Sequence, residues 1–323
     1  MSKILVAGAG GFIGGWLTKR LLADGHQVTA VDIKPMANWY QSFSNADNRI
    51  MDLSLLDNCI EAAREIDEVY NLAADMGGMG FIENHKAECM LSVLINTHLL
   101  VASRNNKVKK FFFASSACVY NAEKQDRPDI DGLKESDAYP AMPEDGYGWE
   151  KLFSERMCRH FYEDFGLETR IARYHNVYGP EGTWEGGREK APAALCRKIA
   201  QARIDKSNKI EIWGDGEQTR SFTFIDDCIE GTLRLMNSDV REPLNIGSDE
   251  MVTINQMVEI LESIADLRVE RIHDLRAPKG VRGRNSDNTK VLKDLMWSPT
   301  TSLRKGLETT YEWIESQLES KEG

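Results

Sequence analysis

The sequence predicts an α/β fold, in which a Rossmann-type doubly wound parallel sheet is joined to a smaller C-terminal α/β lobe. Short apolar runs alternate with amphipathic segments over the first 180 residues, as they do in a parallel sheet with helices on both faces. The first of these runs, Lys3–Ala7, leads directly into a glycine-rich turn. The composition changes after Pro180, which indicates where the second lobe begins.

The composition excludes several classes of protein. The chain has 323 residues, of which 41% are hydrophobic, and this is enough for a large α/β domain with a partner lobe. A net charge of -11 argues against nucleic acid or an anionic membrane as the main partner. The six cysteines show no framework spacing and the six histidines no metal-ligand spacing, so we expect a cytoplasmic protein without a metal. Met1 leads directly into the first strand, and no apolar run is long enough to span a bilayer.

The turn after the first strand predicts a dinucleotide site. Gly8, Gly11 and Gly14 are spaced Gly-x-x-Gly-x-x-Gly, and an amphipathic helix follows to about Ala23. Glycines let backbone N–H groups approach a pyrophosphate, which then lies at the positive end of the helix.

The end of the second strand favours NAD over NADP. This strand, Gln27–Val31, ends in Asp32. A carboxylate at this position accepts both ribose hydroxyls and repels a 2′-phosphate. Further strands are expected over residues 49–53, with Asp52 at the adenine edge, and over residues 68–74.

A long buried strand is expected over residues 110–120, after a glycine-rich loop at 75–80 and a helix at 86–104. Residues two apart on a strand share a face, so Ser116 and Cys118 are expected to point the same way.

The next helix contains a tyrosine and a lysine suited to proton transfer. Tyr147 and Lys151 are four residues apart, so they share one face of the helix. A lysine ammonium beside a phenol favours the phenolate, which lets the tyrosine pass a proton near neutral pH.

The predicted domains are discontinuous in sequence. The NAD-binding domain takes residues 1–180 and about 218–247, because the helix after residue 227 is expected to return to the first domain. The second lobe takes about 181–217 and 248–323.

These motifs carry a family resemblance. The glycine turn, the strand ending in Ser-Ser-Ala, Tyr-x-x-x-Lys and the later Tyr-Gly-Pro resemble the extended short-chain dehydrogenase/reductases that act on nucleotide sugars. Five longer segments are similar to the GDP-mannose 3,5-epimerase family: residues 75–81, 114–118, 186–192, 213–222 and 280–287. The resemblance covers nearly the whole chain. It implies an NAD-dependent epimerase that forms homodimers, binds its GDP-sugar in the second lobe, and converts GDP-D-mannose to GDP-L-galactose, with GDP-L-gulose as a 5-epimer product.

Resemblance and sugar chemistry imply the same sequence of steps. Hydrogens at carbons 3 and 5 become acidic once carbon 4 is a ketone, so oxidation at carbon 4 comes first. The resemblance implies five catalytic residues. Tyr147 takes the proton of the 4-hydroxyl, Lys151 lowers the pKa of Tyr147, and Ser116 hydrogen-bonds the 4-oxygen. Cys118 is the implied base and Lys190 the implied acid of the inversion. The expected cofactor-binding residues are Gly8, Gly11, Phe12, Ile13, Gly14, Asp32, Asp52, Leu53, Leu72, Tyr147 and Lys151. The expected substrate-binding residues are Met76, Gly77, Ser116, Ala117, Cys118, Asn176, Glu189, Lys190, Ala191, Lys198, Gln218, Arg220 and Arg284.

Three alternatives stay open from the sequence. A 3,5-epimerase/4-reductase similar to GDP-fucose synthase also has a cysteine at the position of Cys118, but it consumes NADPH, which Asp32 disfavours. A redox-silent NAD-binding sensor on the same fold is another reading, although such proteins tend to lose the tyrosine or the lysine. Arg282 competes with Arg284 as the residue that binds the pyrophosphate.

Overall fold

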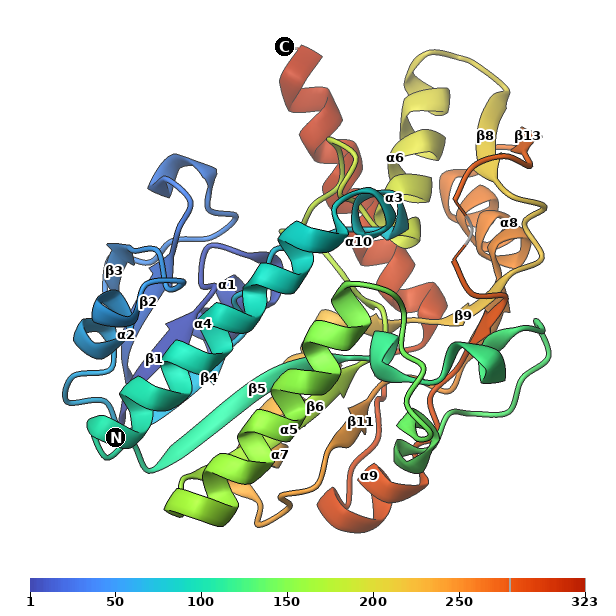
Figure 1. Cartoon of the computed structure of the whole chain (residues 1–323). Helices are drawn as coiled ribbons and strands as arrows, with labels where there is room; N and C mark the ends of the chain where they lie inside the picture. Colours follow the sequence, from blue (N-terminus) through green and yellow to red (C-terminus); the bar gives the residue numbers. More distant parts are fainter. Residues whose placement is uncertain (279, 323) are drawn as a thin grey trace.

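The computed structural model describes residues 1–278 and 280–322 and is built around a seven-stranded parallel sheet (Figure 1). From β1 the chain first builds the sheet outward on one side, through β2 and β3, and then on the other side, beginning with β4. In such sheets a dinucleotide binds at the carboxyl ends of the strands where the direction of building changes. The Rossmann-type doubly wound sheet is therefore confirmed. In sheet order the strands are β11 (Leu244–Ile246), β6 (Glu168–Tyr174), β5 (Lys110–Ser116), β4 (Glu68–Asn71), β1 (Lys3–Ala7), β2 (Gln27–Asp32) and β3 (Asp47–Ile50).

Helices cover both faces of this sheet and bury a separate apolar core on each face. The residues of β5 show how one strand serves both cores. Phe111 and Phe113 belong to one core and Phe112 to the other, because successive side chains of a strand alternate between faces. One face carries α2 (Leu56–Ala62), α4 (Lys86–Asn105) and α5 (Tyr147–Phe165), and the other carries α1 (Phe12–Ala23) and α7 (Ile225–Asn237).

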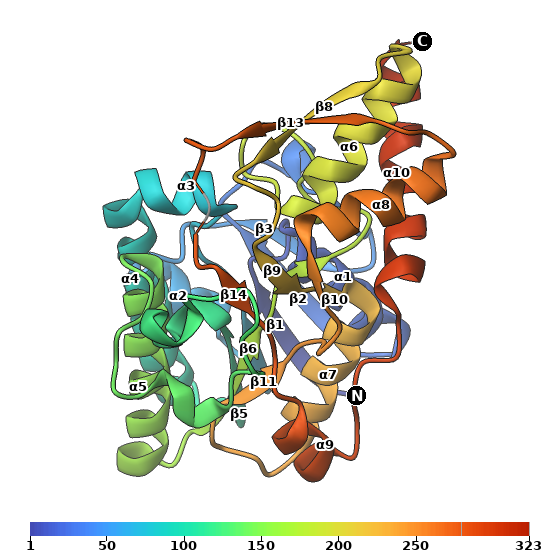
Figure 2. The same ribbon diagram turned by 90° about the vertical axis from the view of Figure 1, so that its right-hand side faces the viewer.

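The remaining strands form three small sheets, and much of the later part of the chain gathers at the top of the view in Figure 2. These sheets are β7 (Val177–Tyr178) with β10 (Thr223–Phe224), β9 (Thr219–Ser221) between β12 (Met251–Thr253) and β14 (Gly283–Arg284), and β8 (Lys209–Trp213) with β13 (Glu270–Asp274). The other helices are α3 (Met79–Asn84), α6 (Ala191–Ile204), α8 (Ile254–Ala265), α9 (Thr289–Leu295) and α10 (Leu303–Glu322). Short 3₁₀ helices span Met36–Asn38, Ala117–Val119, Ala122–Gln125 and Glu135–Ala138. The division into two domains stays a prediction.

Three strands end earlier than the sequence predicts. β3 ends at Ile50 and β4 at Asn71. β5 ends at Ser116, where the chain enters the 3₁₀ helix Ala117–Val119. The prediction that Ser116 and Cys118 share a strand face is wrong, because the Ser116 hydroxyl accepts a hydrogen bond from the Cys118 N–H (3.2 Å) and begins this 3₁₀ helix.

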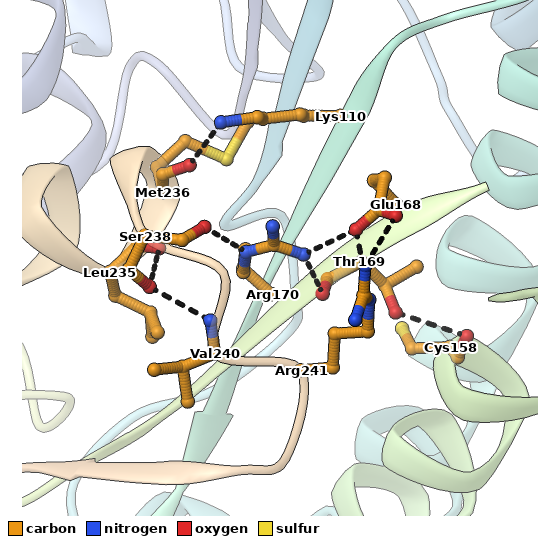
Figure 3. Close-up of polar contacts among 10 residues, drawn as sticks. All are labelled: Lys110, Cys158, Glu168, Thr169, Arg170, Leu235, Met236, Ser238, Val240 and Arg241. Atoms are coloured by element: carbon orange, nitrogen blue, oxygen red, sulfur yellow. Dashed lines mark hydrogen bonds and ion pairs between the residues drawn. The ribbon is translucent and has the colours of Figure 1, made fainter. Parts of the chain in front are cut away.

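A buried arginine connects the end of α7 to the central sheet (Figure 3). Arg170, in β6, is 1% exposed. Its Nε donates to the backbone carbonyl of Ser238 (2.9 Å), and its Nη1 lies 3.0 Å from a carboxylate oxygen of Glu168. Lys110 of β5 donates to the carbonyl of Met236, in the last turn of α7 (3.0 Å). Cations at a helix C-terminus bind its unpaired carbonyls, so these two residues fix α7 against the sheet.

Arg170→Ala is expected to lower the free energy of unfolding by about 3 kcal/mol, because it removes a buried guanidinium and leaves the carbonyl of Ser238 without its donor. Glu168 keeps one partner, because Arg241 also pairs with it (2.9 Å). Urea denaturation measures this change. Arg241→Ala is the matched control, because Arg241 binds the same carboxylate from an exposed position, where such a pair contributes about 0–1 kcal/mol. Equal losses in the two variants would contradict the role given to Arg170.

Within residues 1–278 and 280–322, no helix combines the length and apolar character needed to cross a bilayer.

Candidate active site

The turn between β1 and α1 is packed so closely that it requires glycine. A Cβ atom on Gly14 would lie 2.1 Å from the carbonyl oxygen of Gly8, and Gly8 has a φ of +85°. Gly11 is the N-cap of α1, so the first N–H groups of that helix have no partner within it. The turn therefore fits the pyrophosphate of a dinucleotide, as predicted for such a site.

Asp32 ends β2 directly beside this turn. Its carboxylate accepts hydrogen bonds from the N–H groups of Gly10 and Lys34, each at 3.0 Å. An ionised carboxylate offers about four acceptor positions, so ribose hydroxyls can still bind it. The Nζ of Lys34 donates to the carbonyl of Gly10 (2.8 Å). The sequence analysis missed Lys34, which belongs to no motif.

The other expected cofactor residues lie at the same edge of the sheet. Phe12 and Ile13 begin α1, Asp52 and Leu53 follow β3, and Leu72 follows β4. Their contacts with a cofactor remain predictions.

The end of β5 and the first turn of α5 meet at the centre of the candidate site. A Cβ atom on Gly148 would lie 2.4 Å from the carbonyl oxygen of Cys118, so glycine is what lets α5 come this close. Cys118 and Tyr147 share one small apolar cluster, and Met76 packs against it. The side chain of Ser116 acts on the Tyr147 hydroxyl and lowers its pKa. The structure thus brings together four residues that the sequence analysis selected.

Tyr147 and Lys151 are both buried, at 5% and 3% exposed. The Nζ of Lys151 lies 5.4 Å from the centre of the Tyr147 ring and 3.4 Å from a carboxylate oxygen of Glu150. Burial raises the pKa of Tyr147 well above its ordinary value, and the hydrogen bond with Ser116 partly opposes this. Proton transfer near neutral pH therefore needs positive charge close to the phenol, and Lys151 is positioned to provide it.

Cys118 faces a buried arginine and a buried carboxylate. The Nη1 of Arg284 lies 3.7 Å from its Sγ, and the Nη2 of the same arginine is ion-paired with Glu144. Burial and the charge of Glu144 raise the pKa of Cys118 to about 11, although Arg284 and Ser116 lower it. The sequence analysis missed Glu144. It lies in an irregular loop three residues before Tyr147, where no periodicity marks a functional side chain.

Lys190 is the N-cap of α6. Burial lowers its pKa and the charge of Arg284 lowers it further, whereas Cys118 and Cys228 raise it, so Lys190 is electrostatically coupled to the Cys118 centre. The neighbouring Glu189 has hydrogen-bond partners within the protein. Its carboxylate accepts hydrogen bonds from Arg197 (3.0 Å) and from the backbone N–H of Gly187 (2.7 Å). Ala191 is the first residue of α6.

Two arginines form the basic part of the site. Arg220 in β9 and Arg284 in β14 are neighbours across the strand pair. Burial and the charge of Arg284 lower the pKa of Arg220 to about 9. Adjacent guanidinium groups, here one half-buried and one buried, favour a bound anion such as a diphosphate. Arg282 pairs with Asp215 (3.0 Å), whereas Arg284 faces Cys118.

The remaining expected substrate residues come from several elements. Lys198 and Gln218 donate to backbone carbonyls of β8, at 2.7 and 2.9 Å. The side chain of Asn176 donates to the carbonyl of Ser221 at the end of β9 (3.0 Å). Ala117 is buried in the 3₁₀ helix after β5, and Gly77 lies in the loop before α3.

Within the described part of the chain, no group of three or more histidine, cysteine, aspartate or glutamate side chains is arranged to hold a metal ion.

Comparison with known proteins decides the family. Residues 4–247 match the NAD dependent epimerase/dehydratase family. This chain belongs to that family. The predictions of an enzyme, of the extended short-chain dehydrogenase/reductase fold and of NAD as the cofactor are therefore confirmed.

Curated relatives narrow the resemblance. The chain is 52% identical over 320 residues to GDP-mannose 3,5-epimerase 1 of Oryza sativa subsp. indica, covering 99% of this chain and 83% of the relative. It is 50% identical over 320 residues to GDP-mannose 3,5-epimerase of Arabidopsis thaliana, covering 99% and 84%. These identities confirm the resemblance to the GDP-mannose 3,5-epimerase family.

Solved structures share the fold over nearly the whole chain. A Thermotoga maritima UDP-glucose 4-epimerase with UDP-glucose has a TM-score of 0.87 and 26% identity, covering 98% of this chain and 99% of the other. A Bacillus cereus UDP-glucuronic acid 4-epimerase, solved with UDP-glucuronic acid and NAD, has a TM-score of 0.82 and 29% identity over the same shares.

Proposed function

We propose that this protein is a GDP-mannose 3,5-epimerase, which converts GDP-D-mannose to GDP-L-galactose and GDP-L-gulose. The observation that carries the proposal is the identity of 50–52%, over 99% of the chain, with plant GDP-mannose 3,5-epimerases. The grouping of Ser116, Cys118, Tyr147 and Lys190 supports it, because a 3,5-epimerase needs groups for both oxidation and inversion.

The first stage is oxidation at carbon 4. NAD, held by the glycine turn, Asp32 and Lys151, would supply the hydride acceptor for this oxidation and the hydride donor for the final reduction. Tyr147 takes the proton of the 4-hydroxyl, Lys151 stabilises the phenolate and binds the nicotinamide ribose, and Ser116 donates a hydrogen bond to the 4-oxygen. The ring-to-Nζ distance of 5.4 Å and the burial of both side chains support these roles.

The second stage inverts the carbons on either side of the ketone. Cys118 removes a proton from one face of the sugar ring, and Lys190 supplies a proton to the other face. Their electrostatic coupling supports this pairing, since one proton fewer on the cysteine favours one more on the lysine. Arg220 and Arg284, together with Lys198 and Gln218, are proposed to bind the diphosphate side of the substrate.

Purified protein mixed with GDP-mannose tests the proposed function. Separation of the nucleotide sugars is expected to reveal two new GDP-hexoses, with no net consumption of NAD. Stoichiometric consumption of NADPH and formation of a 6-deoxy sugar from a GDP-4-keto-6-deoxy substrate would favour the reductase alternative. Binding without turnover would favour the sensor.

The nucleotide released by denaturing the purified protein is expected to be mainly NAD. Asp32 is 8% exposed and accepts two backbone hydrogen bonds, which fixes its carboxylate beside the turn, where a 2′-phosphate would be repelled. Chromatography of the released nucleotide checks this. Recovery of mainly NADP would overturn the role of Asp32.

The assembly is proposed to be a homodimer. The helices α4 and α5 pack side by side (Figure 1). Three apolar side chains of α4 and two near the start of α5 are 40–60% exposed: Met90, Leu91, Leu94, Trp149 and Phe153. A second copy that packs α4 and α5 against the same helices covers this surface in a four-helix interface. We also propose a cytoplasmic location, for which the unpaired cysteines are the support.

Light scattering at micromolar concentration is expected to give twice the mass of one chain. Leu91→Glu is expected to shift the protein to the monomer, because a buried charge in the interface costs several kcal/mol. Leu275→Glu is the matched control, since Leu275 is equally exposed, at 61%, but lies elsewhere. A wild-type monomer would contradict the proposed assembly.

A further inference from the structure

Glu144 is a buried carboxylate at the candidate active site that none of the roles above uses. Its backbone N–H donates to the carbonyl of Cys118 (3.0 Å), so the two residues are linked through the main chain. Its side chain is 9% exposed, and one oxygen is ion-paired with Arg284. The other oxygen, Oε2, is buried without a hydrogen-bond partner among the described residues. Burying a carboxylate oxygen without a hydrogen bond is unfavourable, so a role for this side chain is expected.

The contacts of Arg284 indicate what the carboxylate does. The Nε of this arginine donates to the side-chain oxygen of Gln125 (2.8 Å), and its Nη2 pairs with Glu144. The remaining nitrogen, Nη1, then faces the Sγ of Cys118 at 3.7 Å. A guanidinium group is rigid and planar, so fixing two of its nitrogens fixes the direction of the third.

Several charged or titratable groups surround the thiol, and each comes from a different part of the chain. Arg284 and Ser116 favour its ionised form, whereas Glu144 opposes it. The groups that contact the thiol or act on it electrostatically are Ser116 of β5, Glu144 of the loop before α5, Tyr147 of α5, Lys190 at the start of α6, Arg220 of β9 and Arg284 of β14, and Cys89 of α4 shares its apolar cluster.

We propose that Glu144 is a positioning residue for proton transfer at Cys118. One of its oxygens holds the Arg284 guanidinium against the thiol, and its negative charge keeps the cysteine protonated in the resting protein. The importance of this for turnover rests on the proposed function, in which Cys118 is the base. The ionisation of Cys118 itself does not depend on that function, so it can be measured separately.

The charge of Glu144 can be removed without changing its shape. Glu144→Gln keeps an oxygen for Arg284 and loses the charge that opposes ionisation of the thiol, whereas Arg284→Gln loses the charge that favours it. Alkylation of Cys118 by iodoacetamide, followed by mass spectrometry of its peptide over a range of pH, reports the thiolate fraction. The other five cysteines are 0% exposed, so they react more slowly in the folded protein.

The midpoint of this alkylation profile is expected to fall by about one pH unit or more in Glu144→Gln and to rise in Arg284→Gln. Greater access alone would raise the rate at every pH and leave the midpoint unchanged. Asp145→Asn is the matched control, because Asp145 is the next residue, carries the same charge and is exposed, pairing with Lys86. Its profile is expected to equal that of the wild type.

A second readout follows the reaction. The pH dependence of solvent-deuterium incorporation at carbon 5 is expected to shift to lower pH in Glu144→Gln, in step with the alkylation midpoint. A wild-type alkylation midpoint in Glu144→Gln would overturn the proposal. A shifted midpoint in a protein that never incorporates deuterium would support the role of Glu144 and refute the proposed epimerase activity.

Discussion

Tyr147→Phe is expected to lower the rate of GDP-mannose epimerisation by about 10³–10⁴-fold, the upper part of the range for acid–base groups. The reason is that carbon 4 must be oxidised before any other step, and the phenol is the group proposed to take the 4-hydroxyl proton. Phenylalanine preserves the packing in the apolar cluster that contains Tyr147 but removes this proton acceptor. Neither NADH absorbance nor deuterium at carbon 5 is expected after GDP-mannose is added.

A control separates this loss from a general effect on α5. Tyr162 lies in the same helix, where its ring contacts Arg241 on the surface, away from Cys118. Tyr162→Phe is therefore expected to keep wild-type turnover. Tyr147→Phe with normal deuterium incorporation would show that another group accepts the proton, and the assignment of the first stage would then fail.

Cys118→Ala is expected to separate the two stages of the reaction. Epimerisation is expected to fall by at least about 10²–10⁴-fold, because the proposed base for the ring proton is lost. Oxidation at carbon 4 does not need this base, so GDP-mannose should still produce NADH absorbance and a 4-keto sugar. Incubation in deuterium oxide, read by NMR, should show no label at carbon 5.

Cys89 provides a control in the same apolar cluster. It is 0% exposed, so Cys89→Ala removes a similar volume from the same surroundings without removing the proposed base. Cys89→Ala is expected to incorporate deuterium like the wild type. If Cys118→Ala also exchanges at the wild-type rate, Cys118 is a packing residue and the base lies elsewhere.

The part of the fold that sequence predicted best is the part that depends on short-range patterns. Short apolar runs predicted β1 and β2 near their observed positions, and the longer run at residues 110–120 predicted β5 except for its end. Glycine spacing located the cofactor turn, because a Cβ at Gly14 meets backbone 2.1 Å away, a restriction that acts within seven residues. The pair Tyr147 and Lys151 follows from helix periodicity in the same way.

The end of β5 shows where such patterns fail. Residues 110–120 read as one strand, yet the Ser116 side chain accepts the Cys118 N–H and turns the chain into a 3₁₀ helix. A polar side chain that hydrogen-bonds to a nearby backbone group can end a strand by replacing a hydrogen bond of the sheet. The pattern of apolar residues does not predict such a bond. The two residues still lie in one site, for a different reason than the one expected.

The sequence by itself therefore determined the fold class, the NAD turn, the tyrosine–lysine pair and the family resemblance, because each is encoded in residues close together along the chain. The tertiary structure decided how distant segments meet at Cys118. Lys190 arrives from α6, Arg284 from β14 and Glu144 from the loop before α5. Whether a carboxylate is buried against an arginine and a thiol depends on which segments pack together. No local pattern specifies that packing, so Glu144 became visible only in three dimensions.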